Sequence, residues 1–237
     1  MKKKVWSGLV IGVIVVGAIG YVTYDYFVGN HVQIRSVLGQ SQEEGTAMLS
    51  ADWSETFPSE WRIDPESSVF FSVTTSKEKV NIEASDVTGT WTLPDGEGAN
   101  SQASAVVKLD TIDSGNGKRD GHIKESEYLD VAQFPEASFT MTGLAEWPED
   151  LPHNELFEFT VTGDLTIKGV TKETVFQMKG IAEESSIRLD GSATIFFEDY
   201  NVKKPDSVIS SLDEEIALSL QLILVPAMQD TSSEEAK

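Results

Sequence analysis

Three neighbouring residues, Arg119, Asp120 and His122, are the strongest candidates for chemistry in this 237-residue chain. An arginine can hold an anionic group through two parallel hydrogen bonds, and a histidine can move protons as a general acid or base. A hydrolase would also need an activated nucleophile, and no Gly-x-Ser-x-Gly motif is present. We therefore expect no catalytic residues and no enzyme.

The three side chains are predicted to contact the polar end of a ligand or to form a lid. The interpretation that we favour is structural: Arg119 and Asp120 pair with each other or cap a short helix that begins after Gly121.

Composition argues against metals, cofactors and nucleic acid. The chain has no cysteine, and its three histidines lie far apart in the sequence. Asp110, Asp113 and Asp120 do not follow the spacing of a calcium-binding EF-hand loop. The net charge is -21, from 39 acidic and 18 basic residues, so the surface repels phosphate backbones. We expect no metal site, no cofactor and no nucleic-acid partner.

The elements that would position the three candidates are strands. From Trp61 onward, short runs alternate between apolar and polar residues and are separated by Gly, Pro, Asn and Asp. Strands this frequent, with no long amphipathic helix between them, predict an all-β closed antiparallel barrel or a sandwich. One short helix is expected around residues 123–129. Lys168 and Gly169 are typical of a hairpin turn with Gly169 at positive φ and with solvated lysines.

The residues predicted to face the interior are almost all apolar. A barrel of about eight strands has an interior just large enough to hold one small ligand or to be filled by its own side chains. An apolar lining favours an apolar molecule, and the alternative is a surface interaction module with a self-filled barrel. The predicted ligand contacts are Phe71, Val73, Trp91, Val107, Leu109, Phe139, Met141, Phe159, Val161, Phe176, Met178, Ile195, Phe197 and Leu218.

The N-terminus predicts a membrane anchor. Three lysines at positions 2–4 precede residues 5–28, an apolar run whose one charge is Asp25. As a helix, this run crosses roughly 30 Å of hydrocarbon, with the lysines in the cytoplasm and the later residues outside the cell. The alternative is a signal peptide cleaved near Ala18-Ile19-Gly20, which would release a secreted protein. The spacing of Gly8 and Gly12 leaves a homodimer as a further alternative.

These patterns divide the chain into four parts. We expect an anchor or uncleaved signal at residues 1–28, a linker at 29–58, a barrel domain at 59–226 and a disordered acidic tail at 227–237.

Five motifs in order resemble one known family. They are Ile63-Asp64-Pro65, the Val-x-Gly-x-Trp strand at 87–91, Arg119-Asp120-Gly121-His122-Ile123, Phe134-Pro135 with Ser138-Phe139, and the segment from Gly163 to Thr171. Together they resemble the YceI family of exported lipid-binding proteins, over about residues 61–225. The resemblance implies a lipocalin-like barrel that holds a polyisoprenoid or similar lipid without catalysis. With the anchor, it implies a membrane-tethered extracellular lipid-binding protein of the cell envelope.

The chain departs from the pattern of that family at three places. The family has a histidine directly before the serine that opens the first strand, and often another at the end of that strand. Glu66 and Thr75 stand there in this chain, and Phe197 stands where the family usually has an arginine. The resemblance therefore implies no head-group or redox role at these positions, whereas the apolar pocket is unaffected and Phe197 extends it.

Overall fold

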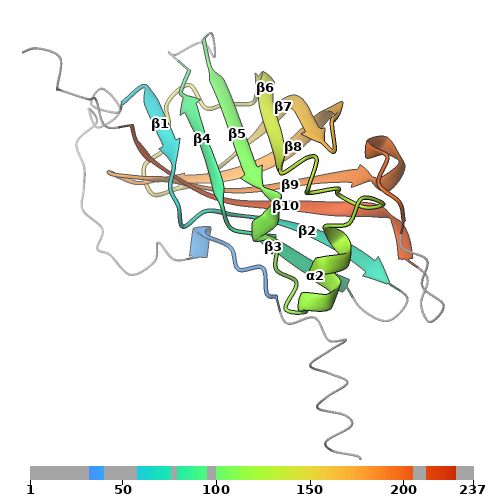
Figure 1. Cartoon of the computed structure of the whole chain (residues 1–237). Helices are drawn as coiled ribbons and strands as arrows, with labels where there is room; N and C mark the ends of the chain where they lie inside the picture. Colours follow the sequence, from blue (N-terminus) through green and yellow to red (C-terminus); the bar gives the residue numbers. More distant parts are fainter. Residues whose placement is uncertain (1–31, 40–57, 76–78, 95–99, 205–211, 228–237) are drawn as a thin grey trace, which may run out of the picture.

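The computed structural model describes residues 32–39, 58–75, 79–94, 100–204 and 212–227. Figure 1 shows long strands that curve around one interior, with the helix α2 at one end. The labels η3 and η4 denote 3-10 helices. In chain order the elements are β1 (Glu60–Ile63), β2 (Ser68–Thr75), β3 (Lys79–Ala84), β4 (Val87–Thr92), β5 (Gln102–Lys108), η3 (Leu109–Thr111), α2 (Gly117–Ile123), β6 (Glu136–Ala145), β7 (Leu156–Ile167), β8 (Val170–Ala182), β9 (Ile187–Phe196), η4 (Phe197–Tyr200) and β10 (Leu212–Pro226).

The strands close into a ring. The sheet runs β1-β4-β5-β6-β7-β8-β9-β10 with every pair antiparallel, and β10 returns to β1. β2 and β3 extend the same sheet. The N-terminal part of β10 pairs with β2, and its C-terminal part pairs with β1 along the same edge. The predicted all-β fold, a closed eight-stranded antiparallel barrel with a short helix, is confirmed for the described residues.

A buried serine bridges the break between β1 and β2. The hydroxyl of Ser67, whose residue is 1% exposed, accepts a hydrogen bond from the amide of Ile223 at 2.9 Å. The backbone amide of Ser67 donates to the carbonyl of Asp64 at 3.0 Å, which closes a turn around Pro65. β1 and β2 therefore follow one another along the same edge of β10. Each of them pairs with a different strand on the side away from β10.

The turn between β7 and β8 is the predicted hairpin. Lys168 and Gly169 both have positive φ, at 50° and 73°, as a type I′ turn requires. The expectation that the lysines here are merely solvated is wrong for Lys168. Its ammonium group donates to the carbonyls of Ser126 and Asn201, at 3.0 and 3.2 Å, because the turn lies against the segments that follow α2 and η4.

The predicted helix position is wrong. The helix covers Gly117–Ile123 rather than residues 123–129. The side chain of Asn116 caps it by accepting from the amides of Lys118 and Arg119, which fixes the start six residues earlier than predicted. After Ile123 the chain forms turns, in which the amide of Leu129 donates to the carbonyl of Ile123.

One end of the barrel is filled by aromatic side chains. Trp147, which follows β6, lies 4.9 Å from Phe159 and 5.5 Å from Phe157 between ring centroids. Trp91 meets Phe159 edge-on at 5.9 Å, and Trp61 on β1 is fully buried. We call this the packed end; the C-terminal parts of β8 and β10 also reach it.

The predicted anchor, residues 5–28, lies outside the described residues, as does nearly all of the predicted tail. None of the helices in the described part of the chain has the length and apolar character needed to cross a membrane.

Candidate ligand-binding cavity

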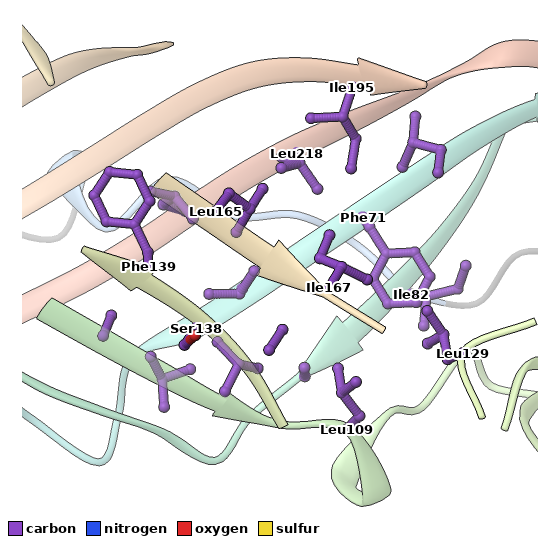
Figure 2. A pocket seen from close by; sticks show the side chains of 18 of the residues that line it. Phe71, Ile82, Leu109, Leu129, Ser138, Phe139, Leu165, Ile167, Ile195 and Leu218 are labelled. Carbon is purple, nitrogen blue, oxygen red and sulfur yellow. The ribbon is translucent and has the colours of Figure 1, made fainter. Parts of the chain in front are cut away.

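The half of the barrel opposite the packed end is hollow. It encloses a cavity of about 970 Å³, near the upper end of the volumes usual for small-molecule sites. Figure 2 shows Phe71, Leu165, Ile195 and Leu218 pointing into a common space from different strands. Among the residues that the structure describes, no aspartate or glutamate lines the cavity, although the chain carries 39 acidic residues.

One wall follows directly from strand register. Ile195 on β9 pairs with Ile216 on β10, which pairs with Val73 on β2, which pairs with Val80 on β3. All four line the cavity. Since paired residues share a face of the sheet, the period-two alternation of each strand adds up to a continuous apolar surface.

The opposite wall depends on a close approach of backbone and ring. Phe139 on β6 is paired with Leu165 on β7, and it meets Phe176 on β8 edge-on at 5.4 Å. A Cβ atom on Gly163 would lie 2.3 Å from the Phe139 ring, so this position admits only glycine without rearrangement. Gly163 thus sets how far Phe139 stands from the wall.

The sequence-based lining is largely where it was predicted. The residues that line the cavity as predicted are Phe71, Val73, Trp91, Val107, Leu109, Phe139, Val161, Phe176, Met178, Ile195, Phe197 and Leu218. Whether they contact a ligand stays a prediction.

Two of the predicted contacts, Met141 and Phe159, do not line the cavity and are corrected here. Phe159 is 1% exposed and belongs to the aromatic cluster of the packed end. Met141 packs on the hydrophobic core, next to an irregularity in the register of β6 and β7. Both pack on the hydrophobic core rather than border the cavity.

Several lining residues were missed. Val80, Ile82 and Ala84 on β3 alternate with polar residues, which is a readable strand signal. Ile123 and Leu129 pack against this strand from α2 and the turn after it, and only the tertiary structure brings them there.

The departures from the family pattern have clear positions. Phe197, on η4, is 8% exposed and lines the cavity, as does Thr75 at the end of β2. Glu66 is exposed and does not line it. Of the three departures, Phe197 therefore adds an apolar side chain to the cavity wall.

A lid, defined as residues 114–129, covers the open end, which we call the mouth. Within the lid, two side chains bind the fully buried Ser114. The guanidinium of Arg119 donates from Nε to the Ser114 hydroxyl and from Nη2 to the Ser114 carbonyl, both at 2.8 Å. A carboxylate oxygen of Asp120 accepts from the Ser114 amide at 2.9 Å and from its hydroxyl. The predicted structural role is thus correct in kind, but both residues bind Ser114 rather than each other, and Asn116 caps the helix.

Further hydrogen bonds hold the lid to the barrel. The ammonium group of Lys124 donates to the carbonyl of Asp110 at 2.7 Å. The amide of Lys203 donates to the carbonyl of Glu127 at 3.1 Å, which joins the segment after η4 to the lid. With Lys168, these contacts tie the lid to three separate elements around the mouth.

Among the described residues, the basic side chains that line the cavity all come from the lid helix. They are Lys118, Arg119 and His122, whereas Asp120 does not reach the lining. The His122 side chain is 71% exposed, and its Nδ1 lies 3.0 Å from a carboxylate oxygen of Glu125. Deeper in the site, burial raises the pKa of Tyr200, although its hydroxyl lies 3.3 Å from that of Thr174. The mouth is polar and basic, and the interior is apolar.

Solved structures share this barrel. Burkholderia cenocepacia BcnA is 18% identical with a TM-score of 0.58, covering 68% of this chain and 98% of that one. A polyisoprenoid binding domain from Saccharophagus degradans is 15% identical with a TM-score of 0.57, covering 70% and 98%. At these identities the likeness shows the fold.

Sequence relatives point to the same family. The protein YceI of Escherichia coli is 27% identical over 124 residues, covering 50% of this chain and 61% of that relative. The protein YceI of Salmonella arizonae is 30% identical over 94 residues, covering 40% and 45%. Both matches span less than two thirds of the relative's length. The model of the YceI-like domain matches residues 61–224, and this chain therefore belongs to the YceI family.

Proposed function

We propose that the barrel binds one long apolar chain of the isoprenoid type, without catalysis, as a lipid-binding protein tethered to the outer face of the cell membrane. The observation that carries the proposal is the cavity of about 970 Å³, which is apolar inside, packed at one end and covered by a lid at the other. A self-filled barrel, the alternative from the sequence, would be packed at both ends. The printed description of the Saccharophagus degradans domain as polyisoprenoid binding supports the ligand class.

Burial of apolar surface would drive the binding. Each 100 Å² of apolar ligand surface removed from water contributes about 2.5 kcal/mol, before the cost of ordering a flexible chain. The walls offer apolar side chains from all eight strands of the ring, and from β2 and β3, and few polar groups that would lose water. A long unbranched or methyl-branched chain fits such a lining better than a compact polar molecule.

The basic residues of the lid helix suggest the orientation of the ligand. Lys118, Arg119 and His122 line the cavity at the mouth, and none of the described acidic side chains lines it. A polar or anionic end group therefore belongs at the lid, with the apolar tail directed toward the packed end.

The location outside the cell rests on the apolar run at residues 5–28 and the three lysines before it. A retained anchor keeps the barrel at the membrane, and a cleaved signal would release it. Mass spectrometry of the intact protein from the membrane fraction separates these two outcomes, because cleavage near Gly20 removes the lysines.

Lipid extraction tests the proposal. Organic extraction of the purified protein, followed by mass spectrometry, should yield a long apolar molecule at one per barrel, and a lipid-depleted sample should take up a fluorescent prenyl lipid. Leu218→Trp, which places a large ring in the cavity, should block uptake. Val175→Trp is the matched control, because Val175 is 47% exposed on the outer surface. A barrel that is empty on purification and takes up no prenyl lipid would contradict the proposal.

A further inference from the structure

A short segment that precedes the family domain docks on the outside of the barrel. Residues 32–39 lie within the predicted linker and before the matched range 61–224. The carbonyl of Val32 accepts a hydrogen bond from the Asn81 side chain on β3 at 2.9 Å. At the other end, the Val37 amide and the Ser36 hydroxyl both donate to the carboxylate of Asp190 on β9. We call residues 32–38 the strap.

The strap covers side chains that point away from the cavity. On β2, Phe71 and Val73 line the cavity, so Phe70 and Ser72 face outward, yet these two are only 3% and 2% exposed. Ser72 donates to the Asn81 side chain, which in turn holds the strap. Val37, at 6% exposure, is buried as well. The strap is therefore held to the outer wall at Val32 and at Ser36 and Val37, and Val37 is the buried residue within it.

The strap begins on the side of the barrel where the mouth lies. Asn81 is flanked on β3 by Val80 and Ile82, which line the cavity and pack against Ile123 and Leu129 of the lid. Figure 1 shows the strap, in blue, running beneath β3 from the region of α2 toward the end of the barrel where β1 lies. The described part of the strap therefore begins, at Val32, on the lid side of the barrel.

Chain length links this geometry to the membrane. Position 28, the end of the apolar run, and Val32 are four residue steps apart, with three residues between them. Four fully extended residues span at most about 14 Å. At the mouth itself, Phe196 lines the cavity and is 39% exposed, so it offers an apolar contact at the rim.

We propose that the strap clamps the barrel with its mouth turned toward the bilayer, so that a lipid passes between membrane and cavity with little exposure to water. This inference rests on the proposed anchoring by residues 5–28. The partner surface is a lipid bilayer, which the rim at Phe196 and the basic lid helix contact. Asn81 and Asp190 act as the two fastening points that set the orientation.

Single-cysteine labelling tests the orientation directly, because the natural chain has no cysteine. Ser126→Cys places a dye on the lid, and Ser185→Cys places it on the turn between β8 and β9 at the packed end; both serines are exposed. The full-length protein is reconstituted into vesicles of phosphatidylcholine and phosphatidylglycerol that contain nitroxide-labelled head groups. We expect at least twofold stronger quenching at position 126 than at position 185.

Release of the strap should remove this difference. The double variant Asn81→Ala with Asp190→Ala lacks both fastening points, and it should show equal quenching at the two labels. Asp164→Ala is the matched control, since Asp164 is an exposed aspartate on β7, and it should keep the difference. Circular dichroism checks that each variant retains its barrel.

The outcomes separate the two proposals. A protein that fails to float with vesicles refutes the anchor. A protein that floats but shows equal quenching before strap release, or an unchanged difference after it, overturns the clamp and leaves lipid binding intact.

Discussion

Replacing one phenylalanine at each end of the barrel should separate stability from binding. Phe159 at the packed end and Phe71 at the hollow end both face inward, so alternation alone treats them alike. Phe159 is 1% exposed and touches three aromatic rings, at centroid distances of 4.9, 5.6 and 5.9 Å. Phe71 is half-buried, and its ring borders the cavity.

The two substitutions have different expected costs. Phe159→Ala removes a ring with close neighbours on several sides and should lower the free energy of unfolding by about 3–5 kcal/mol. Phe71→Ala removes a ring that borders empty space and should cost the empty barrel only about 1–2 kcal/mol. A bound chain covers about half of the Phe71 ring, so its loss should weaken binding by about 1–2 kcal/mol, a factor of roughly 5–30.

Urea denaturation of lipid-depleted protein gives the free energies of unfolding, and titration with a fluorescent prenyl lipid gives the dissociation constants. A fragment covering residues 32–226 contains the strap and every barrel strand, so it suits both assays without detergent. The reasoning is refuted if Phe71→Ala destabilises the empty barrel as much as Phe159→Ala, or if Phe159→Ala weakens binding more while still folded.

Three further substitutions test the lid and one wall. Arg119→Ala removes the guanidinium that donates to the hydroxyl and to the carbonyl of the buried Ser114, so prenyl lipid should dissociate several-fold faster in stopped-flow exchange, and unchanged rates would argue against a lid. Gly163→Ala forces a Cβ to within 2.3 Å of the Phe139 ring, so urea denaturation should show a loss of about 1–3 kcal/mol, whereas an unchanged midpoint would mean that the wall is soft. Lys168→Met removes the donor to two carbonyls around the mouth, and hydrogen exchange should accelerate in the lid but not at the packed end.

Alternation along the strands was enough to predict which side chains face the interior. Val73 and Leu218 line the cavity because each belongs to a strand with clean period-two alternation. Alternation shows which side chains face inward but not how far along the barrel axis they lie. This is why the sequence pattern predicts Phe159 in the cavity. The difference depends on Trp147, a residue beyond β6 that fills one end.

Contacts distant in sequence could not be predicted. Ser36 and Asp190, which fasten the strap, are 154 positions apart. The lid helix was misplaced because its start depends on the cap at Asn116, whereas the Glu-rich stretch after Ile123 has higher helix propensity but forms turns against β3. Local propensity was outweighed by tertiary packing in this case.

Nuclear Overhauser contacts between a bound prenyl lipid and labelled methyl groups give the most direct test of the central claim. The account predicts contacts from the lipid to Val107, Ile195 and Leu218, which line the cavity, and none to Leu156 and Val175, which are exposed outside it. Contacts confined to the outer methyl groups, or no contacts at a saturating lipid concentration, would contradict binding inside the barrel.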